Sequence, residues 1–303
     1  MATLDTTRAA KEVRGIFNNE AAIKSANSAE FSLIRSLLFG YQNGTQPPPG
    51  TPSGLTAPTA SAILLTAVTT NGMTGNSVDT GAVAITMNAA DPFVMEYANG
   101  MPLEDVAWGQ LSLDGLSQQT RLINLPFSIA LLPPYVNQVQ SSNAASHILR
   151  SMEQVVIGET IPGAFGDANS KILTVISSDA YVFGLAGLMR LHWQLPGYQP
   201  DFCAPGGALV FELRQSRRTR EYIVRAYYTS QSFDQLRNLA PLTLDAPPET
   251  MQLTIPGGRK SGANLDVSFR TFQRLLRKAI DPTSVQDPTK EVPPGVLTGV
   301  PLS

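Results

Sequence analysis

The segment from Lys171 to Leu191, KILTVISSDAYVFGLAGLMRL, constrains the fold of this chain most strongly. Residues 171–176 are apolar and mostly β-branched, which predicts a buried strand. A polar break follows, and residues 180–191 have the composition of a helix. A turn between a strand and a helix lies beside the free N–H groups of the helix, a common position for chemistry in α/β folds. Ser178 and Asp179 are therefore the first candidates for a functional site.

The composition narrows the class of protein. The 303 residues suffice for one large domain or two smaller ones, and 15% of them are charged. A net charge of −2 gives no reason to expect nucleic acid or an acidic membrane surface as a partner. No apolar run reaches the ~18 residues that a membrane span needs, and the N-terminus lacks a signal peptide's apolar region. If Met1 is the true start, we expect a cytoplasmic chain.

Periodicity predicts further elements around this centre. Helices are expected at residues 5–23, 28–41, 79–98, 116–139, 144–156, 232–239 and 266–280, and strands at 208–213, 221–229 and 250–255. Pro92 is expected to kink or end the third helix, and the helical region 116–139 is expected to be interrupted at Pro126 and at Pro133-Pro134. Residues 43–60 are rich in Pro, Gly and Thr and predict a linker, and the tail from Pro282 is expected to be loose. The basic segment 214–220, RQSRRTR, is expected to be a solvated hairpin tip.

Several motifs occur in an order and spacing that resemble one known family. They are YANGMP at 97–102 with Trp108-Gly109, VISSD at 175–179, LHWQLPG at 191–197, PGGALVFE at 205–212, and PLTL at 241–244 with LTI at 253–255. In this order they resemble the histidine acid phosphatases, in particular the bacterial branch that contains acid phosphatase/phytase and glucose-1-phosphatase.

The resemblance implies a partial histidine-phosphatase fold of the α/β class, with a mainly parallel sheet flanked by helices and a helical subdomain. Residues 1–60 would be a remnant of the inserted helical cap domain with its Pro/Gly-rich linker. Residues 61–281 would be the α/β domain without its N-terminal strand, and 282–303 the loose tail. Loss of a central strand would leave a marginal or self-associating protein.

In that family the histidine of an RHGxRxP motif attacks phosphorus, and a later His-Asp pair binds the phosphoryl group and protonates the leaving alcohol. The pair falls on Ser178 and Asp179 here, so Asp179 keeps the general-acid position and Ser178 replaces the histidine. No RHG tripeptide occurs, and the two histidines, His147 and His192, lie elsewhere. The chain therefore resembles an N-terminally incomplete member without the nucleophile.

The residues themselves also allow plainer roles. Asp179 is suited to be the N-cap of a helix beginning at Ala180, and the sequence alone favours that role. Ser178 has no base beside it in the sequence and suits a turn. Cys203 lies in a loop without a basic neighbour, which supports a reactive thiol only weakly. The two histidines suit packing or the surface, so no metal and no cofactor are expected.

Three functions remain open at this point. The first is a histidine-acid-phosphatase-like protein that is inactive on its own, as a pseudoenzyme or a truncated product. The second is the C-terminal part of a split or truncated periplasmic acid phosphatase/phytase. The third is a non-catalytic module that binds a phosphate ligand or a partner. Expected partners are phosphate or a small phosphomonoester, and a complementing N-terminal fragment or a second copy. Family relatives are periplasmic or secreted, so the compartment stays undetermined.

Overall fold

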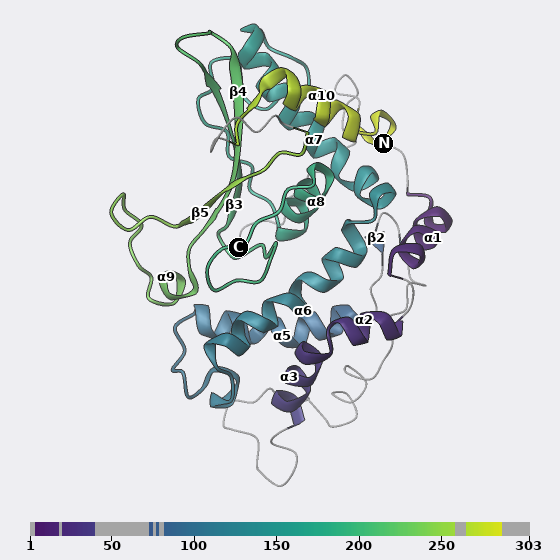
Figure 1. Cartoon of the computed structure of the whole chain (residues 1–303), viewed down its shortest axis with the longest axis vertical. Coiled ribbons are helices and arrows are strands. Elements are labelled where there is room, and N and C mark those ends of the chain that lie inside the picture. The colour runs from purple at the N-terminus through teal and green to yellow at the C-terminus, as the bar shows by residue number, and fades with distance from the viewer. Residues whose placement is uncertain are drawn as a thin grey trace, which may run out of the picture.

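The computed structural model describes residues 4–17, 20–39, 73–74, 77–78, 82–257 and 265–286. Its α-helices are α1 (Thr6–Phe17), α2 (Glu20–Ala26), α3 (Ser28–Phe39), α5 (Ala82–Ala98), α6 (Leu113–Leu131), α7 (Pro134–Ile157), α8 (Asp179–Met189), α9 (Phe233–Arg237) and α10 (Phe269–Ala279). Its strands are β1 (Met73–Thr74), β2 (Ser77–Val78), β3 (Ala208–Gln215), β4 (Tyr222–Ser230), β5 (Glu249–Leu253) and β6 (Val267–Ser268). Figure 1 shows the larger sheet on one side of the molecule and most helices on the other.

The mixed α/β class with a helical part is confirmed, but the strand pairing differs from the expectation. β3, β4 and β5 pair in that order, β6 pairs with β4, and every ladder among the described residues is antiparallel. β3 and β4 form the predicted hairpin, with Ala208 opposite Thr229 and Gln215 opposite Tyr222. A short connection can join only antiparallel neighbours, whereas a parallel pair needs a longer crossover. The expected mainly parallel sheet is thus absent from the described part of the chain.

The predicted buried strand at residues 171–176 is the clearest departure. These residues belong to no ladder in the structure, and Ile172, Leu173, Val175 and Ile176 are all exposed. A strand needs a neighbour to satisfy its backbone, and none of the described strands lies against this segment. The helix predicted after it is confirmed as α8, which begins at Asp179 and ends at Met189.

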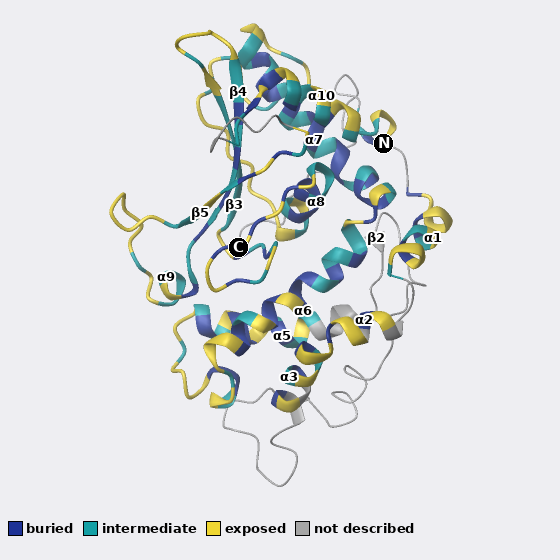
Figure 2. Cartoon of the chain, in the orientation of Figure 1, coloured by how far each residue is buried: buried dark blue, intermediate teal, exposed yellow. Residues whose placement is uncertain are grey.

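α8 lies at the centre of the molecule, where it contacts α6, α7, α10 and β3. Buried residues gather on these central helices and along β4, as Figure 2 shows. Gly184 allows a close approach to α7, because a Cβ there would lie 2.8 Å from Ser141 Oγ. Asn137 Nδ2 donates to the carbonyls of Gly184 (2.8 Å) and Leu131 (2.7 Å), which ties α8 to the turn between α6 and α7. These contacts hold the start of α8 in place.

The helical pattern is largely confirmed, with two corrections. The break expected between residues 139 and 144 is absent, because α7 runs continuously from Pro134 to Ile157. The break between α6 and α7 lies at Leu132 and Pro133, as the Pro-Pro pair predicted. Pro126 and Pro92, however, lie inside α6 and α5 and end neither helix. A proline removes one backbone hydrogen bond, and burial of the surrounding helix offsets that loss. None of the described helices is long and apolar enough to cross a membrane.

The predicted domain limits fall partly outside the described residues. The predicted linker at 43–60 lies outside the described residues. The helices before it pack on the rest of the chain: Ile34 and Leu37 of α3 belong to the main core, and Val13 of α1 packs with Ile129 and Val136.

The start of the predicted loose tail is ordered. Ser284 is fully buried, Asp281 N–H donates to Ser142 Oγ (2.8 Å), and Gln286 N–H donates to Asn143 Oδ1 (2.9 Å). Residues 282–286 are thereby held against α7, because the polar face of that helix offers them partners. Residues 287–303 lie outside the described part.

Candidate functional site

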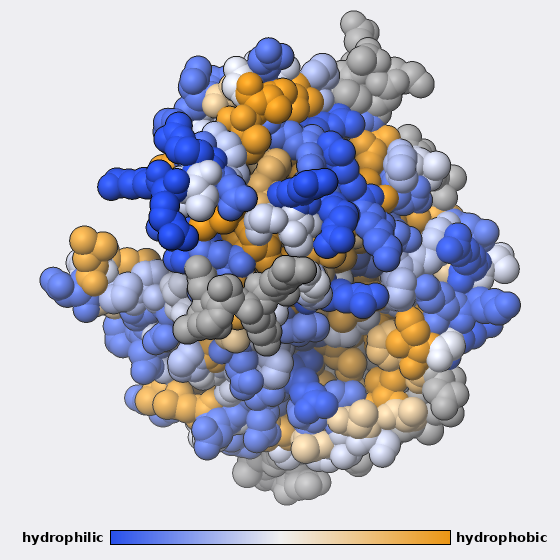
Figure 3. Space-filling view, turned by 45° about the horizontal axis from the view of Figure 1, so that its top comes forward, coloured by the Kyte–Doolittle hydropathy of each residue, from blue (hydrophilic) through white to orange (hydrophobic). Residues whose placement is uncertain are grey.

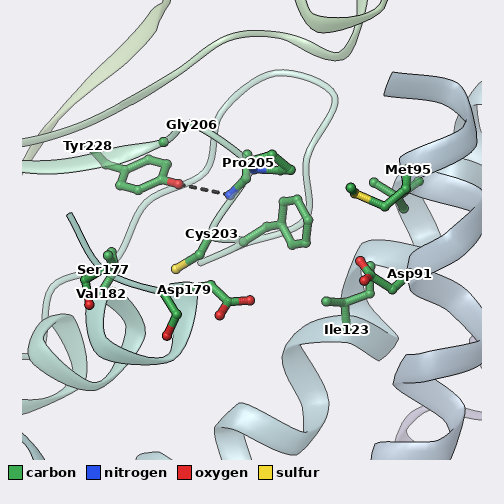
Figure 4. Close-up of a pocket in the computed structure, with 15 residues that line it drawn as sticks. Asp91, Met95, Ile123, Ser177, Asp179, Val182, Cys203, Pro205, Gly206 and Tyr228 are labelled. Carbon is green, nitrogen blue, oxygen red and sulfur yellow. Dashed lines mark hydrogen bonds between the residues drawn. The ribbon is translucent and has the colours of Figure 1, made fainter. Parts of the chain in front are cut away.

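A pocket of about 310 Å³ opens where the N-terminus of α8, the C-terminal half of α5 and the loop before β3 meet (Figure 4). Its apolar lining includes Val94, Met95, Ile123, Val182 and Phe202. Its polar side chains are Asp91, Ser177, Ser178, Asp179, Cys203 and Tyr228. Both residues predicted from the sequence, Ser178 and Asp179, therefore line one pocket.

The geometry at the start of α8 corrects the predicted capping. Ser178 occupies the N-cap position with extended backbone (φ −85°, ψ 164°), and its side chain makes no capping hydrogen bond. Asp179 is the first helical residue, and its Oδ1 accepts the N–H of Ala180 at 2.8 Å. The prediction that Asp179 is the N-cap is wrong by one residue. A carboxylate in the first turn is favoured by the helix dipole, and both side chains stay exposed to a ligand.

Asp91 faces Asp179 across the pocket, as Figure 4 shows. Burial raises the pKa of the Asp91 carboxyl above its ordinary value of 3.8, and the negative charge of Asp179 raises it further. The effect of Asp179 follows from like charges disfavouring ionisation of a neighbour. The pocket thus holds two carboxyl groups, and that of Asp91 keeps its proton to higher pH than an isolated aspartate does.

The wall beneath these carboxyls is built by residues 202–207 and β4. Tyr228 is buried, stacks on Trp193 with ring centroids 4.3 Å apart, and its hydroxyl accepts the N–H of Ala204 at 3.0 Å. Cys203 points toward the same space (Figure 4). Burial raises the pKa of the Cys203 thiol, and the nearby charges of Asp179 and Asp201 act in the same direction. The thiol therefore stays protonated and is a poor nucleophile.

No lysine, arginine or histidine is among the described residues that line the pocket. His147 Nδ1 contacts the carbonyl of Gly163, and its ring stacks on Phe165. His192 is paired with Asp201, with Nδ1 and Oδ2 2.8 Å apart, and is largely exposed. Both histidines thus have packing or surface roles, as the sequence suggested. Among the described residues, no group of three or more His, Cys, Asp or Glu side chains could hold a metal ion.

Two parts of the pocket escaped the sequence analysis. Asp91 is separated from Asp179 by almost ninety residues and carries the single charge in the stretch 82–95, AVAITMNAADPFVM. An acid in so apolar a helix could have marked it. Tyr228 resembles any aromatic residue of a strand, and no local signal distinguishes it. Both reach the pocket only because the fold brings α5 and β4 to the same space as the start of α8 and the 202–207 loop.

Comparison with known proteins finds phytases both by sequence and by structure. No family model matches the chain. It is 27% identical over 207 residues to phytase AppA of Escherichia coli, and 25% identical over 207 residues to glucose-1-phosphatase of Providencia rettgeri. These matches cover 66% of this chain. Phytase from Hafnia alvei in its apo form has a TM-score of 0.74 at 23% identity, and Klebsiella sp ASR1 phytase 0.73 at 19%.

The lengths of these relatives matter for the function. The chain spans about half of the curated relatives, since the matches cover 45% and 46% of their lengths. The structural matches cover 94% of this chain but 68% of the Hafnia phytase and 66% of the Klebsiella phytase. The predicted relationship is nevertheless confirmed: the chain is similar to the histidine acid phosphatases in sequence over about two thirds of its length, and in fold over nearly all of it.

Proposed function

We propose that the pocket is the acid-bearing wall of a phosphomonoester site, and that this chain does not hydrolyse phosphomonoesters by itself. The observation that carries the proposal is Asp179, which reaches the pocket from the first turn of α8. By the resemblance of the sequence, its VISSD segment corresponds to the family's His-Asp pair. Asp179 would protonate the leaving alcohol, the part a carboxylic acid plays in such a site.

The missing part of the chemistry is the nucleophile with its charge neutralisation. Phosphoryl transfer to a histidine needs a histidine in reach of phosphorus and cations beside the phosphoryl oxygens. The two histidines of the chain have other contacts, and no cation is among the described lining residues. Ser178 can donate one hydrogen bond to a phosphoryl oxygen but has no base beside it. A protonated Cys203 cannot replace the histidine.

The charge of the pocket adds a condition on binding. Asp91 and Asp179 repel a phosphate dianion when both are ionised. Because the pKa of Asp91 is raised, that residue is neutral at acid pH and then can donate a hydrogen bond to a phosphoryl oxygen. Binding of phosphate or a small phosphomonoester is therefore expected to strengthen as the pH falls from neutral. A non-catalytic phosphate-binding module would keep this behaviour.

A second candidate is a split phosphomonoesterase, completed by a separate polypeptide that carries the RHGxRxP motif. One observation favours it: the apolar segment 171–176 lies directly before the pocket and pairs with none of the described strands. In that case the added polypeptide would bring both the nucleophile and the arginines. Hydrolysis would appear only after the two chains are mixed.

The test is hydrolysis of an aryl phosphate at acid pH by the purified 303-residue chain, compared with Asp179→Asn and with Asp245→Asn. Asp245 is an exposed loop residue away from the pocket, so its substitution makes the same charge change elsewhere. We expect no turnover above buffer for any of the three. Turnover in the wild type and in Asp245→Asn that vanishes in Asp179→Asn would overturn the inactive assignment.

Binding is measured separately by the melting temperature in millimolar inorganic phosphate or inositol phosphate, at pH 4.5 to 7. A ligand of the folded state raises that temperature. We expect an increase at acid pH that Asp179→Asn alters and Asp245→Asn does not. If no anion raises the melting temperature at any pH, the pocket is not a phosphate site.

A further inference from the structure

An exposed apolar segment precedes the pocket. Ile172 and Ile176 are 85% and 95% exposed, and Val175 is 58% exposed. Leu173 is partly covered, because its side chain lies against the loop at Gly166. Contiguous exposed apolar side chains mark a surface that another molecule covers. The other described parts of this chain leave the segment open, so its cover comes from outside the described fold.

The backbone of the same residues is equally unpartnered. No N–H or C=O group of residues 172–176 takes part in a ladder or in another backbone hydrogen bond within the described part of the chain. Four of the five residues are β-branched, which favours an extended strand. An unpaired apolar strand adds readily to a strand of another chain. What it lacks is therefore a neighbouring strand.

The sequence ILTVI at 172–176 is close to a palindrome. Antiparallel pairing of two copies about Thr174 places Ile172 opposite Ile176, Leu173 opposite Val175, and Thr174 opposite itself. Apolar β-branched pairs and Thr-Thr pairs are both favourable across antiparallel strands. A shift by one residue would place an isoleucine opposite a valine or a serine at the ends and lose the threonine pair. Only the register centred on Thr174 matches every apolar residue.

The flanking charges are complementary in this register. Lys171 lies opposite Ser177 of the other copy and diagonal to its Asp179. Lys171 and Asp179 are both exposed, and diagonal neighbours lie within reach of a long side chain. The two-fold axis repeats this pair at each end of the ladder. No like-charged residues face one another across it.

We propose that residues 172–176 of two copies of this chain pair antiparallel, centred on Thr174, to form a two-fold symmetric dimer. Such an interface is isologous and closes on itself, so no third copy can join through the same edge. It satisfies the inner backbone edge of both segments and buries the isoleucines that are most exposed. The inference concerns assembly and holds whether or not the pocket acts on a phosphomonoester. A separate strand-bearing polypeptide, as in the split enzyme, would have to displace this dimer.

Sedimentation of the full chain between about 1 and 100 µM tests the dimer. We expect a concentration-dependent monomer-dimer equilibrium. Ile176→Lys should raise the dissociation constant about 100-fold or more, since each dimer loses two buried isoleucines and gains buried charge. Leu244→Lys is the matched control, because Leu244 is fully exposed in a different loop and should leave the equilibrium unchanged. Ile176 is so exposed that its substitution should leave the circular dichroism of the monomer intact.

Disulfide cross-linking tests the register. Directly opposed residues of two strands have Cβ atoms within about 5 Å, close to the separation that a disulfide needs. Thr174→Cys should therefore form a covalent dimer on mild oxidation. In the same register the two copies of residue 172 lie four residues apart along the ladder, about 13 Å, so Ile172→Cys should not cross-link.

The proposal is overturned by a monomer at every concentration, or by a dimer that Ile176→Lys leaves as tight as before. Equal cross-linking of the two cysteine variants overturns the register, and with it the proposed pairing. A segment found covered by a different polypeptide in the purified protein would assign this edge to the split enzyme instead.

Discussion

The wall of the pocket depends on a glycine that leaves no room for a side chain, and Gly207→Ala tests this directly. An ideal Cβ at Gly207 would lie 2.2 Å from the hydroxyl oxygen of Tyr228, 2.9 Å from its Cζ and 2.9 Å from the carbonyl oxygen of Ala204. The backbone at Gly207 is not left-handed, so only space opposes an alanine there. Tyr228 is buried and stacked on Trp193, and it cannot move away freely.

The expected cost has two parts. Forcing a methyl group into a packed site costs about 1–3 kcal/mol. Displacing the Tyr228 hydroxyl also weakens its hydrogen bond from the Ala204 N–H, and an unsatisfied buried donor costs about 1–3 kcal/mol. The loop and Tyr228 can relax in part, so the two costs together stay below the sum of their upper limits. We expect Gly207→Ala to lower the free energy of unfolding by about 3 kcal/mol.

Urea denaturation followed by circular dichroism measures the change, with Gly206→Ala as the neighbouring control. Gly206 has φ +70° and nothing within 4 Å of its ideal Cβ, so alanine there carries only the conformational cost of about 1 kcal/mol. Tyr228→Phe removes the nearest clashing atom. In a double-mutant cycle, Tyr228→Phe should lower the free energy of unfolding of the wild type. In the Gly207→Ala protein the same substitution should lower that free energy by at least about 1 kcal/mol less.

Two results would refute this reasoning. One is a Gly207→Ala protein no less stable than Gly206→Ala, which would mean that the loop and Tyr228 separate easily. The other is a double-mutant cycle in which the effects of Gly207→Ala and Tyr228→Phe simply add. That result would mean that the added methyl group does not clash with the Tyr228 hydroxyl.

Three further predictions concern charge and reactivity. Because burial and Asp179 raise the pKa of Asp91 in the folded state, its contribution to stability is lost as pH rises from 3.8 through the folded pKa. Asp91→Asn should therefore be more stable than the wild type at pH 7, with a higher urea midpoint of unfolding. The difference between the two midpoints should disappear near pH 3. Arg225→Leu should cost about 3 kcal/mol in urea, since it removes the positive charge and two hydrogen bonds from the buried carboxylate of Asp266, which keeps a hydrogen bond from the neutral Gln252. Cys203 should react with a thiol reagent at pH 8 only slowly until denaturant is added, because its pKa is raised.

Each of these has a clear contrary outcome. If the difference in urea midpoint between Asp91→Asn and the wild type is unchanged at pH 3, ionisation of Asp91 is excluded as its cause. Arg277→Leu is the comparison for the ion pair, because Arg277 is 61% exposed and Glu153 keeps a hydrogen bond from Gln273, so the loss should cost less than about 1 kcal/mol. Equal costs for the two arginine variants would show that burial of Asp266 is unimportant. A Cys203 thiol that reacts at once in the native protein would contradict its burial.

Local patterns predicted much of the fold correctly. The two strand-like runs at 208–213 and 221–229, separated by a short basic segment, predicted the β3–β4 hairpin, because each strand pairs with a neighbour only a few residues away. The apolar stripe of residues 266–280 likewise predicted α10, whose Phe272 and Leu276 are buried. The break before Pro134 and the helix after Ser178 also follow from local chemistry. In each case the information lies within a dozen residues of the element itself.

The candidate site was predicted only in part. Ser178 and Asp179 were identified because a polar turn interrupts an apolar segment, and both line the pocket. Asp91, Cys203 and Tyr228 join them from three other segments. Their raised pKa values come from burial in the packed fold and from the charges or ionisable groups that packing brings close. No local pattern carries that information.

By itself, the sequence determined most of the helices, the β3–β4 hairpin and the polar turn at the start of α8, because these depend on side chains near one another along the chain. Only the tertiary structure decided which residues share the pocket and what became of the strand at 171–176. A β-branched apolar run specifies an extended, buried segment, but burial and pairing need a neighbour. Among the described residues no neighbour is present, and the segment predicted as a central strand therefore lies on the surface.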